Sequence, residues 1–232
     1  AVTSQRAILE HVLGGQVFAV QRGSVFIDGL ILDGGSTGRP IYVGPNGYAN
    51  LNNAVLQFGV DVDNRGGGCA LVQGRLDGSG VSMASCSAER GGAISVAGGR
   101  VEIVDSTIQN GSAWQGGAIY AQNAEVTIRR SMLEDNSSLA GGDVRVADSS
   151  VEIDDSDFSS LAGGVPLWVV GGEVVVNDSI MFTDLMAAVV VQGAESVVLD
   201  GLAAYVGGIA LSDVDSFNIG RSSVCGALSF GL

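Results

Sequence analysis

Apolar and polar residues alternate along most of the chain in short runs that end in glycine, asparagine or aspartate. Val17–Val20 and Val25–Leu32 are two such runs, separated by a turn at Gln21–Gly23. Alternation that is rich in β-branched and aromatic residues, and bounded by turn residues, predicts short β-strands. We therefore expect an all-β chain.

Three near-copies of one unit follow one another between Glu89 and Ser160. The block Gly91–Val96 returns as Gly116–Ala121 and again as Gly141–Val146, each 25 residues after the last. A unit of this length cannot bury its apolar face alone, and stacking of neighbouring units solves that problem. The repeat therefore predicts a solenoid.

A second apolar block, of the type Val-x-Ile, follows the first at an interval of seven residues. The interval recurs outside the three copies, so it marks a corner that every coil keeps. The pairs are Phe18 and Val25, Ile94 and Val101, Ile119 and Val126, Val144 and Val151, Leu167 and Val174, Val190 and Val197, and, more loosely, Ala210 and Phe217. We predict one parallel β-helix over residues 1–232, with eight or nine coils of 20 to 25 residues and three short strands per coil.

Stacking such coils brings like residues together on neighbouring rungs. Inward apolar residues are expected to form ladders whose burial is the main stabilising term. A serine ladder is expected to bond to itself or to the turning backbone; its members are Ser106, Ser131, Ser156 and Ser179. On the outside, Arg129 and Arg130 should lie between acidic rungs at Asp105 and Asp154, where ion pairs between coils relieve like-charge repulsion.

The net negative charge of the chain argues on physical grounds against some classes of binding partner. The chain has 25 acidic residues against 11 arginines, no lysine, and a net charge of -14. We do not expect nucleic acid as a partner, because phosphate binding needs a basic surface. We also expect no membrane insertion, because no run of 18 apolar residues is present. Without an initiator Met or a polar capping end, the chain is interpreted as a fragment of a longer polypeptide. Its acidic surface fits an extracellular protein or one that meets cations.

Residues 44–66 break the repeat and predict an irregular, expanded coil. Within this stretch Asp61, Asp63 and Asn64 could supply oxygen ligands to calcium, although the glycine and distal glutamate of a known calcium loop are missing. We expect no other cofactor. The single histidine, His11, lies among apolar residues and is expected to be structural.

Cysteines and sequons suggest covalent modifications. Cys69 and Cys86 are close enough to sit on neighbouring coils, so an oxidising compartment would permit a disulfide; two free buried thiols are the alternative. Asn110 and Asn136 each begin an Asn-x-Ser sequon at a coil turn, where a eukaryotic source would allow a glycan.

Two motifs resemble known families. Gly-Gly-Ala-Ile at Gly91 and Gly116, with Leu133–Asn136, resembles the GGAI and FxxN repeats of the polymorphic outer membrane protein family, although Leu133 replaces Phe and the third block reads Gly-Gly-Asp-Val. The stretch Val25–Gly35 is similar to the opening of many surface proteins of the pectate lyase-like superfamily. The resemblance implies a right-handed parallel β-helix on a cell surface or in an extracellular matrix, acting in adhesion or assembly. We therefore expect end-to-end or lateral packing with other domains or subunits.

The same superfamily includes polysaccharide lyases and hydrolases, which gives an alternative function. The best candidate for such a site is Asp154, Asp155 and Asp157 with Arg130, because a hydrolase needs two or three carboxylates around the scissile bond. The His-Gly and Arg-x-Lys segments of polygalacturonases are absent from the sequence. We therefore expect a non-catalytic structural or adhesive module, with polysaccharide binding or cleavage as the alternative.

Overall fold

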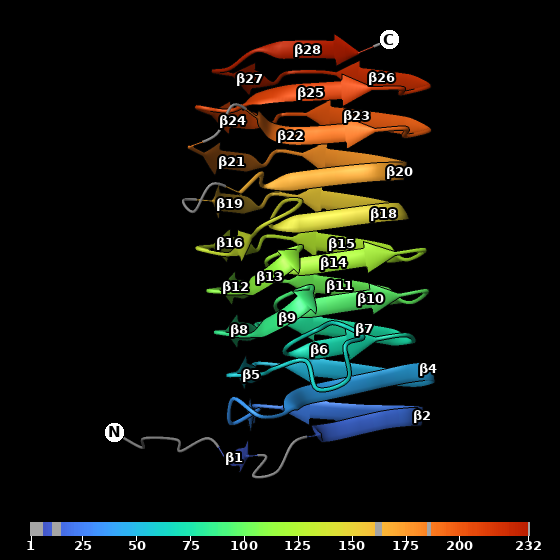
Figure 1. Ribbon diagram of the computed structural model, residues 1–232, viewed down its shortest axis with the longest axis vertical. Helices are drawn as coiled ribbons and strands as arrows, with labels where there is room; N and C mark the ends of the chain where they lie inside the picture. Colours follow the sequence, from blue (N-terminus) through green and yellow to red (C-terminus); the bar gives the residue numbers. More distant parts are fainter. Residues whose placement is uncertain (1–6, 11–14, 161–163, 185–186, 232) are drawn as a thin grey trace.

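The chain winds into a parallel β-solenoid of about nine turns (Figure 1). The computed structural model describes residues 7–10, 15–160, 164–184 and 187–231, and His11 lies outside these ranges. In Figure 1 the chain runs from left to right along the front and returns along the back as it climbs towards the C-terminus, which is a right-handed path. The expected all-β fold is confirmed. No helix that could cross a membrane occurs in the described residues.

Two sides of each coil belong to one 15-stranded sheet. The first side contains the strands that follow the Gly-Gly blocks, and the second side contains the Val-x-Ile strands. Four long strands, β2, β4, β18 and β20, turn the corner and serve both sides. The strands are β2 (Gln16–Asp28), β4 (Arg39–Asn52), β6 (Ala70–Val72), β7 (Arg75–Ser79), β10 (Ile94–Ala97), β11 (Arg100–Val104), β14 (Ile119–Gln122), β15 (Glu125–Arg129), β18 (Val144–Asp154), β20 (Leu167–Asn177), β22 (Ala187–Gln192), β23 (Ser196–Asp200), β25 (Gly208–Ser212), β26 (Ser216–Ile219) and β28 (Leu228–Gly231).

The third side of the coils is a ten-stranded parallel sheet. Its strands are β1 (Ile8–Glu10), β3 (Ile31–Asp33), β5 (Val55–Gln57), β8 (Ser82–Ala84), β12 (Thr107–Gln109), β16 (Met132–Glu134), β19 (Asp157–Ser160), β21 (Ile180–Thr183), β24 (Ala203–Tyr205) and β27 (Ser223–Val224). The prediction of three strands per coil is therefore correct for most of the rod.

Three central coils have a fourth side that the sequence did not predict. Here β9 (Ser87–Arg90), β13 (Ser112–Gln115) and β17 (Ser137–Ser138) form a small parallel sheet. These coils are slightly longer than the coil that follows them: the register repeats after 24 residues at Ile94 and after 25 at Ile119 and Val144, but after 23 at Leu167. The one or two extra residues per coil give room for the added strand.

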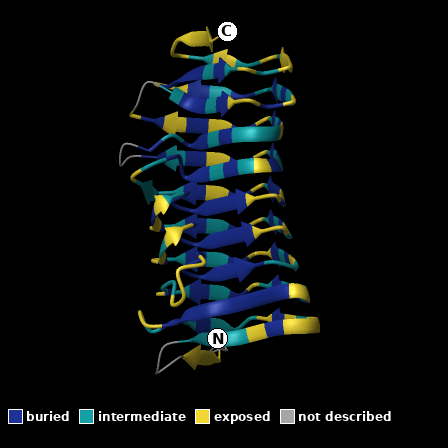
Figure 2. Cartoon of the chain, turned by 45° about the vertical axis from the view of Figure 1, so that its right-hand side comes forward, coloured by how far each residue is buried: buried dark blue, intermediate teal, exposed yellow. Residues whose placement is uncertain are grey.

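Apolar ladders run through the interior, as the repeat predicted. Ile94 pairs with Ile119, which pairs with Val144, and all three are fully buried. Figure 2 shows the buried residues following the whole rod, with exposed residues at the turns and terminal strands. Each buried aliphatic side chain contributes about 1.5 to 3 kcal/mol. The ladders are therefore the main source of stability.

The corner between the second and third sides combines left-handed residues with the serine ladder. Asp105, Arg130 and Asp155 have φ angles of 50°, 45° and 46°. The serine that follows each of them is buried, and its hydroxyl bonds to backbone on two coils. Ser131 Oγ donates to Arg129 O at 2.8 Å and accepts from Ser106 N at 3.1 Å. The hydroxyls therefore bond to the turning backbone, including the N–H of the preceding serine in the ladder, and not to other hydroxyls.

Two details of the predicted repeat need correction. Leu167 pairs with Val189, not Val190, because the corner before β23 contains one more residue than the earlier corners. Val190 and Ala210 do pair with each other, but they lie one residue away from the buried row of Val189 and Ile209. In addition, most of residues 44–52 is a regular part of β4 in register with β7. The extra residues of the long coil instead form the segment 58–69, between β5 and β6.

Candidate functional sites

The segment 58–69 folds around a buried arginine instead of forming an open oxygen-rich loop. Arg39 is fully buried, and its Nη2 contacts Asp61 Oδ1 and Asp63 Oδ1 at 2.8 Å each. Arg39 also donates to the carbonyls of Gly66 and Gly67 at 2.9 and 2.7 Å. The guanidinium thus occupies the position that a cation would need, and these carboxylates are already neutralised.

The pKa of Asp63 is consistent with its role as a partner of Arg39. Burial alone would raise the pKa of Asp63, but hydrogen bonds from Arg39 and Arg65 hold it well below its ordinary value. No cluster of three acidic, histidine or cysteine side chains suited to a metal occurs in the described part of the chain. Asp61 and Asp63 are therefore better explained as partners of Arg39 than as calcium ligands.

The Arg39 segment also covers the outer face of the first side. The Arg65 guanidinium lies 5.1 Å from the centre of the Tyr42 ring, and Ser95 Oγ contacts Arg65 O at 3.5 Å. Leu71 points outward between them and is only 1% exposed. The excursion that interrupts the repeat thus acts as a cover for β4, β6 and β10.

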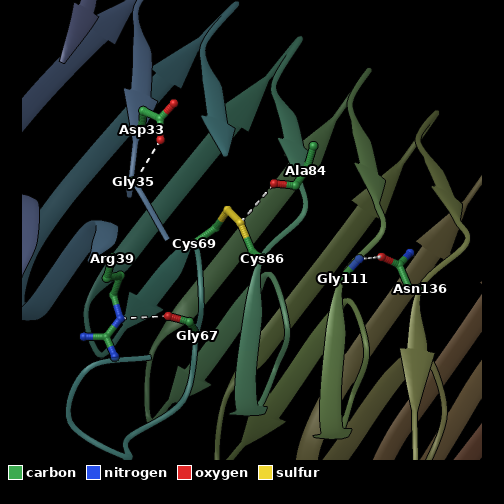
Figure 3. Close-up of a disulfide and its surroundings, with 9 residues drawn as sticks. All are labelled: Asp33, Gly35, Arg39, Gly67, Cys69, Ala84, Cys86, Gly111 and Asn136. Carbon is green, nitrogen blue, oxygen red and sulfur yellow. Dashed lines mark hydrogen bonds between the residues drawn. A yellow bond between two sulfur atoms is a disulfide. The ribbon is translucent and has the colours of Figure 1, made fainter. Parts of the chain in front are cut away.

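Cys69 and Cys86 form a disulfide that closes a single coil (Figure 3). Their Cα atoms are 5.5 Å apart, and both side chains are buried. Cys69 precedes β6 and Cys86 follows β8, so the bridge joins the first and third sides of one coil, not neighbouring coils as the spacing had suggested. The third cysteine, Cys225, is free and exposed.

The sequons at Asn110 and Asn136 differ in accessibility. Asn110 is exposed, whereas Asn136 is fully buried. Asn136 Oδ1 accepts from Gly111 N at 2.8 Å (Figure 3). Asn136 Nδ2 donates to Ile108 O at 3.0 Å. Asn136 therefore caps the corner of the preceding coil, and its amide is not available for a glycan in the folded chain.

The acidic cluster proposed for catalysis is only partly assembled. Asp155, Asp157 and Arg130 line a shallow depression of about 420 Å³ on the outer corner, but Asp154 is not among its lining residues. Arg130 binds Asp105 through two hydrogen bonds of 2.8 and 2.9 Å, which lower the pKa of the Asp105 carboxyl. Asp155 and Asp157 are exposed to solvent. The depression thus lacks the buried carboxyl that a glycosidase uses as its acid.

Arg129 lies where the sequence predicted, on the rung between Val104 and Asp154. Its guanidinium bridges Glu102 at 3.3 Å and Glu152 at 3.0 Å, one coil to either side. Arg100 similarly contacts Glu125 at 3.3 Å on the next coil. Acidic and basic side chains on this face are thus used to connect coils.

A long groove follows the corner between the first and second sides. It has a volume of about 790 Å³ and crosses six coils, from Pro45 to Glu173. Small residues occupy the corner because the coils approach closely there: a Cβ added at Gly99 would lie 2.4 Å from Gly74 O. Longer polar side chains border the row of small residues; among them are Arg75, Arg100, Asn123, Glu125, Asp148 and Glu173.

One functional candidate was missed altogether. Asp143 is fully buried, and Ser160 Oγ contacts its Oδ1 at the long distance of 3.4 Å. Its Oδ2 has no hydrogen-bond partner within the described structure. The only signal in the sequence is the third Gly-Gly block, which has Asp where the first two have Ala.

No family model matches the chain, and neither a curated protein nor a solved structure shows significant similarity to it. The functional argument therefore depends on the fold and on these sites.

Proposed function

We propose that the chain is a non-catalytic structural or adhesive module of an extracellular or cell-surface protein. In this proposal it acts as a stiff rod that holds its outer faces in fixed positions and packs against other domains or subunits. About nine coils at roughly 4.8 Å each give a length of about 40 Å. The resemblance of the Gly-Gly blocks to repeats of surface proteins agrees with this role.

The observation that carries the proposal is how the charged side chains are used. Arg39, Arg129 and Arg130 each bind carboxylates from other rungs or from the covering segment. The acid–base pairs suggested by the sequence are thus engaged in stabilising the rod. The buried disulfide supports an extracellular location, since disulfides persist in oxidising compartments.

A panel of neutral, uronic acid and sulfated polysaccharides tests the absence of catalysis. After prolonged incubation with the purified chain, we expect neither new reducing ends nor unsaturated products. Cleavage that disappears in an Asp155→Asn/Asp157→Asn variant, and persists in an Asp178→Asn control, would replace the structural proposal with an enzymatic one.

Polysaccharide binding is the second candidate, and the corner groove favours it. The groove runs along the rod axis and offers hydroxyl, amide and charged groups from six coils, which suits an extended polar polymer. Titration calorimetry with polygalacturonate should then give weaker binding for Arg100→Ala than for Arg221→Ala, whose guanidinium lies outside the groove. If the native chain, Arg100→Ala and Arg221→Ala bind equally or not at all, polysaccharide binding by the groove is excluded and only the structural role remains.

A further inference from the structure

We infer that Asp143 makes one turn of the solenoid, from β18 through β19 to β20, a pH-sensitive joint. In this joint the coil is closed while the carboxyl holds a proton and opens more readily as that proton is lost. This property goes beyond the proposed structural role.

The surroundings of Asp143 offer almost no hydrogen bonds that would stabilise an ionised carboxylate. Its backbone is fixed in the ladder, where Asp143 O accepts from Ala118 N at 2.9 Å and Asp143 N donates to Val165 O at 2.8 Å. The side chain is fully buried at a level where the two preceding coils have Ala93 and Ala118. One long contact from Ser160 is the only hydrogen bond that the described residues give to the carboxyl.

The surrounding charges do not compensate for this burial. The charged group that acts on Asp143 is Asp135, which follows β16, and its effect is repulsive. The adjoining β14 has no ionisable side chain other than Tyr120. On β18, Arg145 stacks on Trp168 at 5.3 Å and so lies on the outward-facing row. The interior therefore holds an acid without a cationic partner.

Burial is the main cause that raises the pKa of Asp143 to about 8, from an ordinary value of 3.8; the Ser160 hydrogen bond opposes the shift and Asp135 adds to it. The closed coil thus binds the proton more tightly than the open coil does. Below about pH 4 both states are protonated, and above about pH 8 both are ionised. Between these limits opening releases one proton, so the opening equilibrium constant should rise about tenfold per pH unit.

Hydrogen exchange of the full chain, followed peptide by peptide between about pH 5 and about pH 8, tests this inference. After correction for the intrinsic exchange rate, protection of amides in β18 and β19 should fall about tenfold per pH unit in the native chain. Asp143→Asn should abolish this dependence, and the exposed control Asp157→Asn should retain it. Should Asp143→Asn not fold, Asp143→Ala serves instead, because it copies the two preceding coils.

Two results would overturn the inference. The first is protection that does not change with pH in the native chain, or that changes equally in Asp143→Asn. The second is protection that depends on added calcium or sodium and not on pH, which would mean that a cation keeps the carboxylate charged.

Discussion

The coil that begins at Cys69 and the coil that begins at Asp143 use equivalent positions in opposite ways. Backbone hydrogen bonds link Cys69, Ala93, Ala118 and Asp143 as successive members of one row. In the coil that begins at Cys69, this cysteine forms a disulfide across the coil, and the neighbouring Arg39 network adds a buried ion pair. In the coil that begins at Asp143, the equivalent residue is an aspartate whose carboxyl has one long hydrogen bond.

This difference shows that uniform ladders do not imply uniform stability. In a solenoid each coil contacts only its neighbours, so a local defect lowers the stability of one segment without changing the fold. Asp143→Ala should strengthen the weak coil, Arg39→Met and loss of the disulfide should weaken the strong one, and Ser131→Ala should weaken a corner that lies between them.

Asp143→Ala is expected to have the largest effect, and to be stabilising. Because the pKa of Asp143 is raised by folding from 3.8 to about 8, the acid destabilises the native chain progressively as pH rises between these values. Four pKa units correspond to roughly 5 kcal/mol. Denaturant unfolding should therefore show a gain that is larger above pH 8 than near about pH 4 by up to about 5 kcal/mol. A loss of stability at the higher pH would contradict this account.

Arg39→Met should weaken the strong region by about 3 to 5 kcal/mol, because it leaves a buried carboxylate without its cation. Asp61, whose side chain is 5% exposed, is the group left unpaired. Adding Asp61→Asn to Arg39→Met should recover part of the loss in urea unfolding. If the single variant is as stable as the native chain, the guanidinium does not hold the segment 58–69 in place.

Loss of the disulfide should have a somewhat smaller effect. The bridge spans 17 residues, and closing a loop of this size stabilises a fold by about 3 kcal/mol. Cys69→Ser/Cys86→Ser should lower the unfolding free energy by about that amount, while Cys225→Ser, which removes an exposed free thiol, should leave it unchanged. Equal stability of the native chain with and without reductant would argue against a bridge in solution.

Ser131→Ala should have the smallest effect of the four, about 1 to 3 kcal/mol. The substitution removes the acceptor of the buried Ser106 N–H, which then stays unpaired. Ser87→Ala, at an exposed position, is the matched control. A Ser131 variant indistinguishable from that control in thermal unfolding would mean that the serine ladder contributes nothing to the corner.

Much of the fold was predictable because local patterns determine it. The rungs at Ile94, Ile119 and Val144 follow from a strict repeat of alternating residues, and register follows from the same pattern. The predicted register was wrong by one residue at Val190, because the repeat is less regular there and the corner contains one more residue. A spacing of 17 residues between the cysteines is shorter than a coil, so the closure of a single coil could also have been deduced.

The candidate sites were less predictable because they depend on contacts between distant segments. Arg39 has no repeated counterpart, and nothing near it in the sequence indicates that it meets Asp61 and Asp63. The buried role of Asn136 depends on the backbone of the preceding coil. Asp143 was visible as a departure from Gly-Gly-Ala, but its meaning requires knowledge that this position faces the interior.

Limited digestion with trypsin near pH 8 tests the contrast between the two coils most directly. The chain has no lysine, so cleavage reports only on arginines, and seven of these lie between Arg65 and Arg145. If the Asp143 coil is the weakest turn, the first cut among these seven should follow Arg145, and Asp143→Ala should suppress it. A first cut after Arg65, Arg75 or Arg90, beside the disulfide, would contradict the account.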